Sequence, residues 1–289
     1  IFLAGSSFRV IYETPDDEAE SFRLLTATDA AHRFAPWQIV GGTEKQTKLV
    51  PLFPIWKASA DHRQYDNITF DPSERKSNPK HYNLWTGLKV SPPDRTIRRK
   101  NAPGGWRLIA RHLFEVICSG NAANFEWLLA WNADMYQDPT HKKGTSVVLT
   151  SPERGTGKST LGNVNQRILG RHAQKFFGTD SLTSNFNAGL AEALLVIGEE
   201  ILFSGNRKGA NLLKGMITED TVQLERKTVD KVQIKSHSRY LLCSNEERAA
   251  PAETATERRY FILRVGAQYA KTGEPKHDAM AKSYFDSLY

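Results

Sequence analysis

Short apolar runs separated by amphipathic stretches dominate the second half of the chain. SVVLT (146–150), ALLVI (193–197) and RYLLCSN (239–245) predict buried strands, and GKSTLGNVNQRIL (157–169) has the apolar spacing of a helix. Strands that are apolar at every position lie in parallel sheets covered by helices on both faces. The pattern therefore predicts an α/β fold, with a mainly parallel sheet sandwiched by helices.

Apolar and polar positions alternate over short segments in the first part of the chain. Residues 1 to about 58 show no helical periodicity, and SFRVIYET, SFRLLTAT and PWQIV predict short strands. Residues 106–118 and 125–135 have the spacing of two helices. The segment 90–105, rich in proline, glycine and basic residues, predicts a boundary. We expect a partly β accessory or collar region at 1–104, and a helical lead-in plus core at 105–289.

The amino-acid composition limits the classes of protein to which the chain can belong. Hydrophobic residues make up 39% and charged residues 25% of 289 residues, an ordinary globular balance. The formal net charge of +7 favours a polyanionic partner, although many proteins that never touch nucleic acid share it. Two cysteines without metal-site spacing indicate a reducing cytoplasmic compartment, and no apolar run suits a membrane span. A chain that starts at Ile1 and ends in a helix-like segment is expected to be a fragment, truncated at its C-terminal end.

The loop after the strand 146–150 has the composition of a phosphate-binding loop. It carries Gly155, Thr156, Gly157, Lys158, Ser159 and Thr160 between a buried strand and a helix start. Glycines let backbone N–H groups approach phosphate oxygens, Lys158 reaches the outer phosphates, and Ser159 can ligate Mg²⁺. Pro152 replaces the first glycine of the strict pattern, at a less demanding position. We therefore predict a P-loop that binds and hydrolyses a nucleoside triphosphate with Mg²⁺.

Hydrolysis needs one carboxylate that holds the metal ion and another that orients or deprotonates the attacking water. Glu199 and Glu200 leave the C-terminal end of an apolar strand, where such sheets bind ligands. We assign Glu199 to Mg²⁺ and Glu200 to the water, with the order of the two roles left open.

Two further polar features lie at the ends of apolar strands: one follows a strand, and the other precedes one. Ser244 and Asn245 end the strand 239–245, where a neutral amide can bridge the water and the terminal phosphate, although Ser and Asn also begin ordinary turns. Arg258 and Arg259 precede the apolar run YFILRV and are either surface charge or an arginine finger for a neighbouring subunit's nucleotide. We prefer Arg259 over Arg258 for that role.

TVQLERKTVDKVQIKS has the alternation of a hairpin with a basic turn. Val222 and Val232 belong to its two strands, and Arg226, Lys227 and Lys231 lie between or beside them. Such a hairpin can grip a single DNA strand through its backbone. An ordinary solvated hairpin tip fits the same pattern.

The order of these parts resembles the superfamily 3 helicases, which are ring-forming AAA+ ATPases of viruses, phages and mobile elements. The resemblance rests on GTGKST, LLVIGEE, NLLKGMITEDTVQLERK, RYLLCSN and ERRYF, in that order. ITFDPSERKSNPKHYNLWTGLKV and WRLIARHLFEVICSGN also resemble the branch in which this module follows a primase or primase-polymerase domain. Gly198-Glu199-Glu200 departs from the Asp-Glu of many relatives, which leaves the order of the two roles open but costs neither a carboxylate.

The resemblance implies a fold and a mechanism. The fold is an AAA+ P-loop NTPase core, preceded by a short helical segment and a smaller β-containing region. The chain is expected to form a ring, as a hexamer, with ATP between subunits, Asn245 as polar sensor and Arg259 as the finger. Lys227 and Lys231 would sit on a DNA-gripping hairpin in the pore. Hydrolysis then drives the ring along single-stranded or forked DNA in the host cytoplasm, with a primase upstream.

Two other functions compete with a DNA helicase. One is a loader or assembly ATPase that holds DNA without unwinding it, and the other is a P-loop kinase for a small molecule. Kinases of that kind usually carry a lid with several arginines and need no basic hairpin. A loader and a helicase share every feature named above, so the sequence does not separate them.

Overall fold

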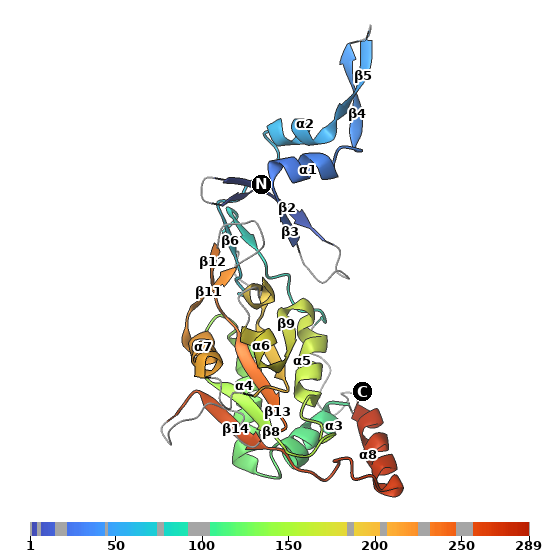
Figure 1. Cartoon of the computed structure of the whole chain (residues 1–289), viewed down its shortest axis with the longest axis vertical. Helices are drawn as coiled ribbons and strands as arrows, with labels where there is room; N and C mark the ends of the chain where they lie inside the picture. The colour runs from blue at the N-terminus through green and yellow to red at the C-terminus, as the bar shows by residue number, and fades with distance from the viewer. Residues whose placement is uncertain are drawn as a thin grey trace, which may run out of the picture.

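Five parallel strands form the central sheet of the computed structural model (Figure 1), in the order β14-β8-β13-β10-β9. The structure describes residues 2–4, 7–14, 22–43, 46–73, 78–91, 105–183, 188–202, 207–224, 232–246 and 257–288. The strands are β8 (Ser146–Thr150), β9 (Ala173–Phe177), β10 (Leu195–Glu199), β13 (Arg239–Ser244) and β14 (Tyr260–Arg264). This sheet confirms the predicted α/β fold with a mainly parallel sheet.

Alternate strand residues enter two separate apolar layers, because successive side chains of a strand point to opposite faces. The layer that contains Val147 and Leu149 packs against α4 and α5, and the layer that contains Val148 packs against α6 and α7. The helices are α4 (Ala122–Gln137), α5 (Thr160–Leu169), α6 (Gly178–Thr183) and α7 (Arg207–Thr218). Both faces of the sheet are therefore covered, as expected for strands that are apolar throughout.

The predicted lead-in helix is present but changes its winding. Helix α3 (Gly105–His112) continues into a π-helical turn (Leu113–Ile117), where the Cys118 N–H donates to the Leu113 carbonyl at 2.9 Å. The wider turn buries Leu113, Val116 and Ile117 together. At the other end of the chain, α8 (Pro275–Leu288) contacts α3.

The N-terminal part contains short strands, as predicted, and two helices that the alternation did not predict. The strands are β1 (Phe2–Ala4), β2 (Ser7–Glu13), β3 (Phe22–Leu25), β4 (Gln38–Thr43), β5 (Gln46–Pro51), β6 (Asn67–Thr69) and β7 (His81–Asn83). The helices are α1 (Ala27–Arg33) and α2 (Leu52–Ala58).

The expectation that residues 1–58 lack helices was wrong for a physical reason. Each helix has seven residues and buries a single one, Ala30 in α1 and Phe53 in α2, which is too little for a periodic pattern. The strand predicted for SFRLLTAT ends at Leu25, because Thr26 caps α1. Thr26 and Asp29 form a capping box, a signal that the sequence does contain.

Residues 67–86 share the core of the parallel sheet. The buried His172 ring accepts a hydrogen bond from the Thr86 N–H at Nε2 (3.1 Å) and donates from Nδ1 to the Glu192 carbonyl (2.9 Å). The rings of Phe70 and Trp85 lie 5.5 and 4.4 Å from that of His172. Burial lowers the pKa of His172 to about 4, which keeps the ring neutral. The division of the chain at residue 104 stays a prediction.

No helix within the described ranges is long and apolar enough to cross a membrane.

The buried ion pair of Arg239 supplies a test of the core. Its guanidinium lies 2.9 Å from the Asp134 carboxylate and also donates to the carbonyls of Asp138 and His141, with 3% of the side chain exposed. Arg239→Met is expected to lower the free energy of unfolding by about 3 kcal/mol, because it strips these buried acceptors of their donor. Urea denaturation measures the change. Arg111→Gln, which breaks an exposed pair with Glu115, serves as the control and should leave the midpoint unchanged; equal effects would contradict the assignment.

Candidate functional site

The loop between β8 and α5 adopts a backbone that only glycine tolerates at two positions. Gly155 and Gly157 have φ values of 73° and 86°, in the left-handed region. A Cβ atom on Gly157 would lie 2.6 Å from the His112 ring and 2.7 Å from that of Phe285. Gly157 is therefore required by both its backbone conformation and the space around it.

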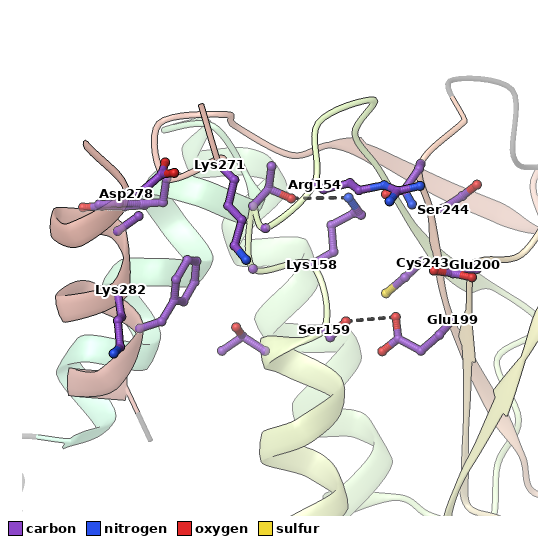
Figure 2. Close-up of a pocket in the computed structure, with 18 of the residues that line it drawn as sticks. Arg154, Lys158, Ser159, Glu199, Glu200, Cys243, Ser244, Lys271, Asp278 and Lys282 are labelled. Carbon is purple, nitrogen blue, oxygen red and sulfur yellow. Dashed lines mark hydrogen bonds between the residues drawn. The ribbon is translucent and has the colours of Figure 1, made fainter. Parts of the chain in front are cut away.

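The loop forms one wall of a cavity of about 800 Å³ at the carboxyl edge of the sheet (Figure 2). The ends of β10 and β13 form a second wall, and α8 faces the loop from the other side. Residues of the loop and the strand ends that line it are Arg154, Gly155, Thr156, Gly157, Lys158, Ser159, Thr160, Glu199, Glu200, Cys243, Ser244 and Asn245. Residues on the α8 side are Tyr269, Lys271, Asp278, Ala281, Lys282, Phe285 and Asp286.

Lys158 occupies the centre of the loop wall with only 9% of the residue exposed. Its ammonium group donates to the carbonyls of Ser151 and Glu153, at 3.3 and 3.2 Å, and to the Thr156 hydroxyl. Burial lowers the pKa of Lys158, and the Glu199 and Glu153 carboxylates oppose that shift. The ammonium group thus lies at the amino end of α5, where an anion also gains from the helix dipole.

Glu199 lies beside the serine that follows Lys158. The Ser159 hydroxyl donates to Glu199 Oε2 at 2.9 Å, and Lys175 Nζ lies 3.8 Å from Oε1. Within the described residues, Oε1 is buried without a hydrogen-bond partner. A carboxylate and a hydroxyl side by side, with one oxygen unsatisfied, fit a hard divalent cation such as Mg²⁺, which takes few protein ligands and completes its shell with phosphates and water.

Glu200 differs from Glu199 in both backbone and exposure. Its φ of 55° is one of two positive values among the described non-glycine residues, and its side chain is exposed at the cavity. Backbone strain of this kind concentrates at functional sites. The structure thus separates a buried carboxylate beside Ser159 from an exposed one at the cavity.

The end of β13 brings Asn245 to the same cavity, beside Cys243. Burial raises the pKa of the Cys243 thiol well above its usual value, so the thiol stays protonated. Asn245 is the only neutral amide among the lining residues. The predicted sensor position therefore faces the same space as Lys158.

Arg259 is not part of this cavity. It precedes β14, and its guanidinium pairs with Glu257 at 2.9 Å. Because all five strands are parallel, the start of β14 lies at the opposite edge of the sheet from the phosphate-binding loop. Arg258 precedes it on the same edge.

The predicted hairpin is present in its two strands, β11 (Thr221–Leu224) and β12 (Val232–Lys235), with Val222 opposite Ile234. Arg226, Lys227 and Lys231 lie outside the described residues. The base of the hairpin is fixed by Lys142, a residue that the sequence reasoning missed.

Lys142 ties three segments together at that base. Its ammonium group donates to the carbonyls of Met216 (2.6 Å) and Glu219 (2.8 Å), at the end of α7, and to the Ser236 hydroxyl after β12 (3.3 Å). A cation there complements the negative end of the α7 dipole. Burial lowers the pKa of Lys142 to about 8. No local pattern marks such a lysine, because its partners lie far along the chain.

His112 is a second residue that the sequence did not reveal, and it contacts the loop between β8 and α5. Its Nε2 lies 3.1 Å from the Gly157 carbonyl, and its Nδ1 lies 3.1 Å from the Tyr284 hydroxyl of α8. Since a carbonyl only accepts, Nε2 carries the proton and Tyr284 donates to Nδ1. Burial lowers the pKa of His112, which favours this neutral form. A fixed Gly157 carbonyl also fixes the N–H of Lys158, because the two share one peptide plane.

Known proteins resemble this chain in sequence and in fold. A sequence profile described as a family of unknown function (DUF5906) matches residues 149–259, from the end of β8 to Arg259. The DNA primase-polymerase of Nitratiruptor phage NrS-1 is 28% identical over 160 residues. That match covers 54% of this chain and 22% of the relative, so the chain spans a small part of that protein.

Two solved structures of the NrS-1 C-terminal region have a similar fold. One apo structure has a TM-score of 0.60 and 20% identity over 86% of this chain and 60% of that one. The A form apo structure has a TM-score of 0.58 and 16% identity, over 87% and 62%. The chain thus resembles part of a phage replication protein in sequence and shares the fold of that protein's C-terminal region.

Proposed function

We propose that this chain is the ATP-driven module of a phage or mobile-element DNA-replication protein. It hydrolyses ATP with Mg²⁺ between subunits of a ring, most simply a hexamer, and moves along single-stranded or forked DNA. The observation that carries the proposal is the convergence of Lys158, the Ser159–Glu199 pair and Asn245 on one cavity. These groups come from three separate strand ends, and each suits a different part of a bound nucleotide.

Each residue has a defined task in this proposal. Lys158 and the loop amides bind and neutralise the outer phosphates. Ser159 and Glu199 would hold the metal ion, which would supply positive charge to neutralise the phosphates. Asn245 orients the attacking water, and Glu200 accepts its proton. The remaining part of the cavity, toward α8, has room for the nucleoside.

Arg259 is proposed to complete the site of a neighbouring subunit. Its position at the far edge of the sheet prevents it from reaching the phosphates bound by its own chain. The Arg259 side chain is 37% exposed beside Glu257, so its guanidinium can exchange that partner for a phosphate when subunits meet.

The hairpin β11–β12 is proposed to contact the DNA backbone through Arg226, Lys227 and Lys231, which lie between its two strands in the sequence. The Lys142 contacts join the hairpin base to α7, whose apolar side packs on the same sheet that ends in Glu199. Packed side chains therefore connect the nucleotide site with the hairpin, and we propose that a change at one affects the other. Because the phage relative is named a DNA primase-polymerase, we expect a primase or polymerase domain as a partner of this chain.

Lys158→Ala is expected to reduce ATP hydrolysis at least about 100-fold, because the charge on the outer phosphates loses its main protein cation. Steady-state ATPase assays with and without single-stranded DNA measure this, and DNA should stimulate the unmodified protein and the control variant but not Lys158→Ala. Lys276→Ala, an exposed lysine of α8 outside the cavity, is the matched control. Stimulation by a metabolite instead of DNA would favour the kinase, and DNA-stimulated turnover without strand displacement would favour the loader.

Arg259→Ala should leave ATP binding nearly intact and stop hydrolysis, whereas Arg258→Ala should retain activity. Mixing two inactive variants, Arg259→Ala and Lys158→Ala, should restore activity at about a quarter of the interfaces of a random ring, because each supplies the part that the other lacks. ATPase assays of the mixture check this. An inactive mixture of variants that still assemble argues against a shared site.

His112→Phe keeps an aromatic ring, slightly larger than imidazole, but removes the donor to the Gly157 carbonyl. We expect the KM for ATP to rise about 10-fold with little change in kcat, because an unsatisfied buried carbonyl costs about 1–3 kcal/mol and the loop loses its fixed orientation. His112→Gln, which offers an amide N–H, should recover part of the affinity. If the Phe and Gln variants lose the same affinity for ATP, and the loss parallels a fall in thermal stability, then His112 has only a packing role.

A further inference from the structure

The cavity at the phosphate-binding loop has two ends, and the loop lies between them. Figure 2 shows Lys158 and Ser159 with α8 on one side and Glu199 on the other. In the proposed function, Glu199 would hold the metal ion, so the terminal phosphate lies at the Glu199 end. The nucleoside then extends past the loop toward α8, an orientation that rests on the proposed function.

Helix α8 turns one face toward this cavity. Its lining residues recur at intervals of three or four positions, which places them on one side of a helix. They are Asp278, Ala281, Lys282, Phe285 and Asp286. Tyr269 and Lys271, from the segment before α8, also line that side. These seven residues are hereafter the α8 wall.

The charges of the α8 wall cancel. Lys271 and Lys282 are matched in number by Asp278 and Asp286. A wall without excess positive charge offers a triphosphate no net attraction, because attraction and repulsion offset each other. The Lys158 ammonium group and the amino end of α5, on the loop side, do attract an anion. The α8 wall therefore suits the uncharged ribose and base rather than the phosphates.

Phe285 gives the α8 wall an aromatic surface that is half-buried. Its ring meets those of His112, Tyr269 and Tyr284 at interplanar angles of 71°, 70° and 73°, so none of the three is stacked on it. Tyr269, the other aromatic residue of the wall, is already stacked on Tyr284 at 3.7 Å and 6°. Because nucleobases stack on aromatic side chains, Phe285 is the better platform for a base.

Contacts behind the α8 wall hold it in place. The Tyr284 hydroxyl bonds the His112 ring at 3.1 Å, and its ring is the one that covers Tyr269. The Asp278 carboxylate accepts the backbone N–H groups of Thr272 and Gly273, at 2.9 and 3.2 Å, which fixes the start of α8. A wall that is ordered before a ligand arrives loses little conformational freedom on binding.

We propose that the α8 wall binds the nucleoside of the triphosphate and that the base stacks on Phe285. Beyond the first turn, the backbone N–H groups of α8 donate within the helix, so they cannot bind the polar edge of a base. Stacking area rather than edge recognition then selects the base. The favoured substrates are therefore purine nucleoside triphosphates, which have the larger ring.

Calorimetric titration of the full chain with Mg²⁺ tests this, using a non-hydrolysable ATP analogue and inorganic tripolyphosphate, which lacks a nucleoside. Phe285→Leu keeps an apolar side chain beside Gly157 but removes the ring. It should weaken binding of the analogue about 10-fold and leave tripolyphosphate binding unchanged. Phe285→Tyr retains the ring and should bind the analogue like the unmodified chain. Met280→Ala shortens a 49% exposed side chain of α8 outside the cavity and is the control.

The two ligands separate the possible failures. Equal weakening of both by Phe285→Leu means that Phe285 acts only on the loop, and no weakening of either means that the base lies elsewhere. Each result overturns the proposal. An unmodified chain that binds neither ligand overturns the nucleotide site itself, and with it the proposed function.

Photolabelling locates the base directly. An ATP derivative with an azide on the adenine ring should label the peptide that contains Phe285, as identified by mass spectrometry. Excess tripolyphosphate should suppress the label, because both ligands compete for the loop. GTP should suppress it at lower concentration than CTP, because a purine stacks over a larger area. A label confined to other peptides, or equal competition by GTP and CTP, contradicts stacking on Phe285.

Discussion

The crowding of three segments at Gly157 is the constraint on which the site depends. His112 of α3 and Phe285 of α8 approach the loop so closely that even a methyl group does not fit, and the Gly157 carbonyl is held by the same histidine. The direction of the Lys158 N–H is thereby set by α3 and α8, two helices that lie far apart in the sequence but contact each other in the structure. The proposed anion binding by the loop thus depends on the packed core as well as on the loop sequence.

The parallel sheet also determines at which of its two edges a polar side chain lies, because that depends on whether the residue follows a strand or precedes it. Groups that follow strands, such as Glu199 and Asn245, gather at one edge, and a group that precedes a strand, such as Arg259, is carried to the other. A cavity supplied by one edge remains open toward solvent. In the proposed ring, Arg259 would reach the cavity of a neighbouring chain from the opposite edge of its own sheet.

The sequence predicted the core well because its signals are local. Strands such as 146–150 are apolar at every position, and Lys158 is flanked by both of the elements that a phosphate-binding loop needs. His112 and Lys142 escaped prediction because their partners lie far away in sequence, and neither residue type is unusual in its own segment. The sequence did not predict α1 and α2, because each helix buries only one residue and so shows no periodic pattern. The Thr26–Asp29 capping box is nevertheless a recognisable helix-start signal in the sequence.

The packing of residues 67–86 around His172 affects how the chain can be divided into fragments. Phe70, Trp85 and Thr86 cover one side of that ring, and Ile68 and Phe70 belong to the same apolar cluster as the sheet. A fragment begun at residue 105 would leave this cluster facing water and would strip the neutral imidazole of its donor. Any excised core that is meant to stay in solution should therefore keep residues 67–90, whatever is removed before them.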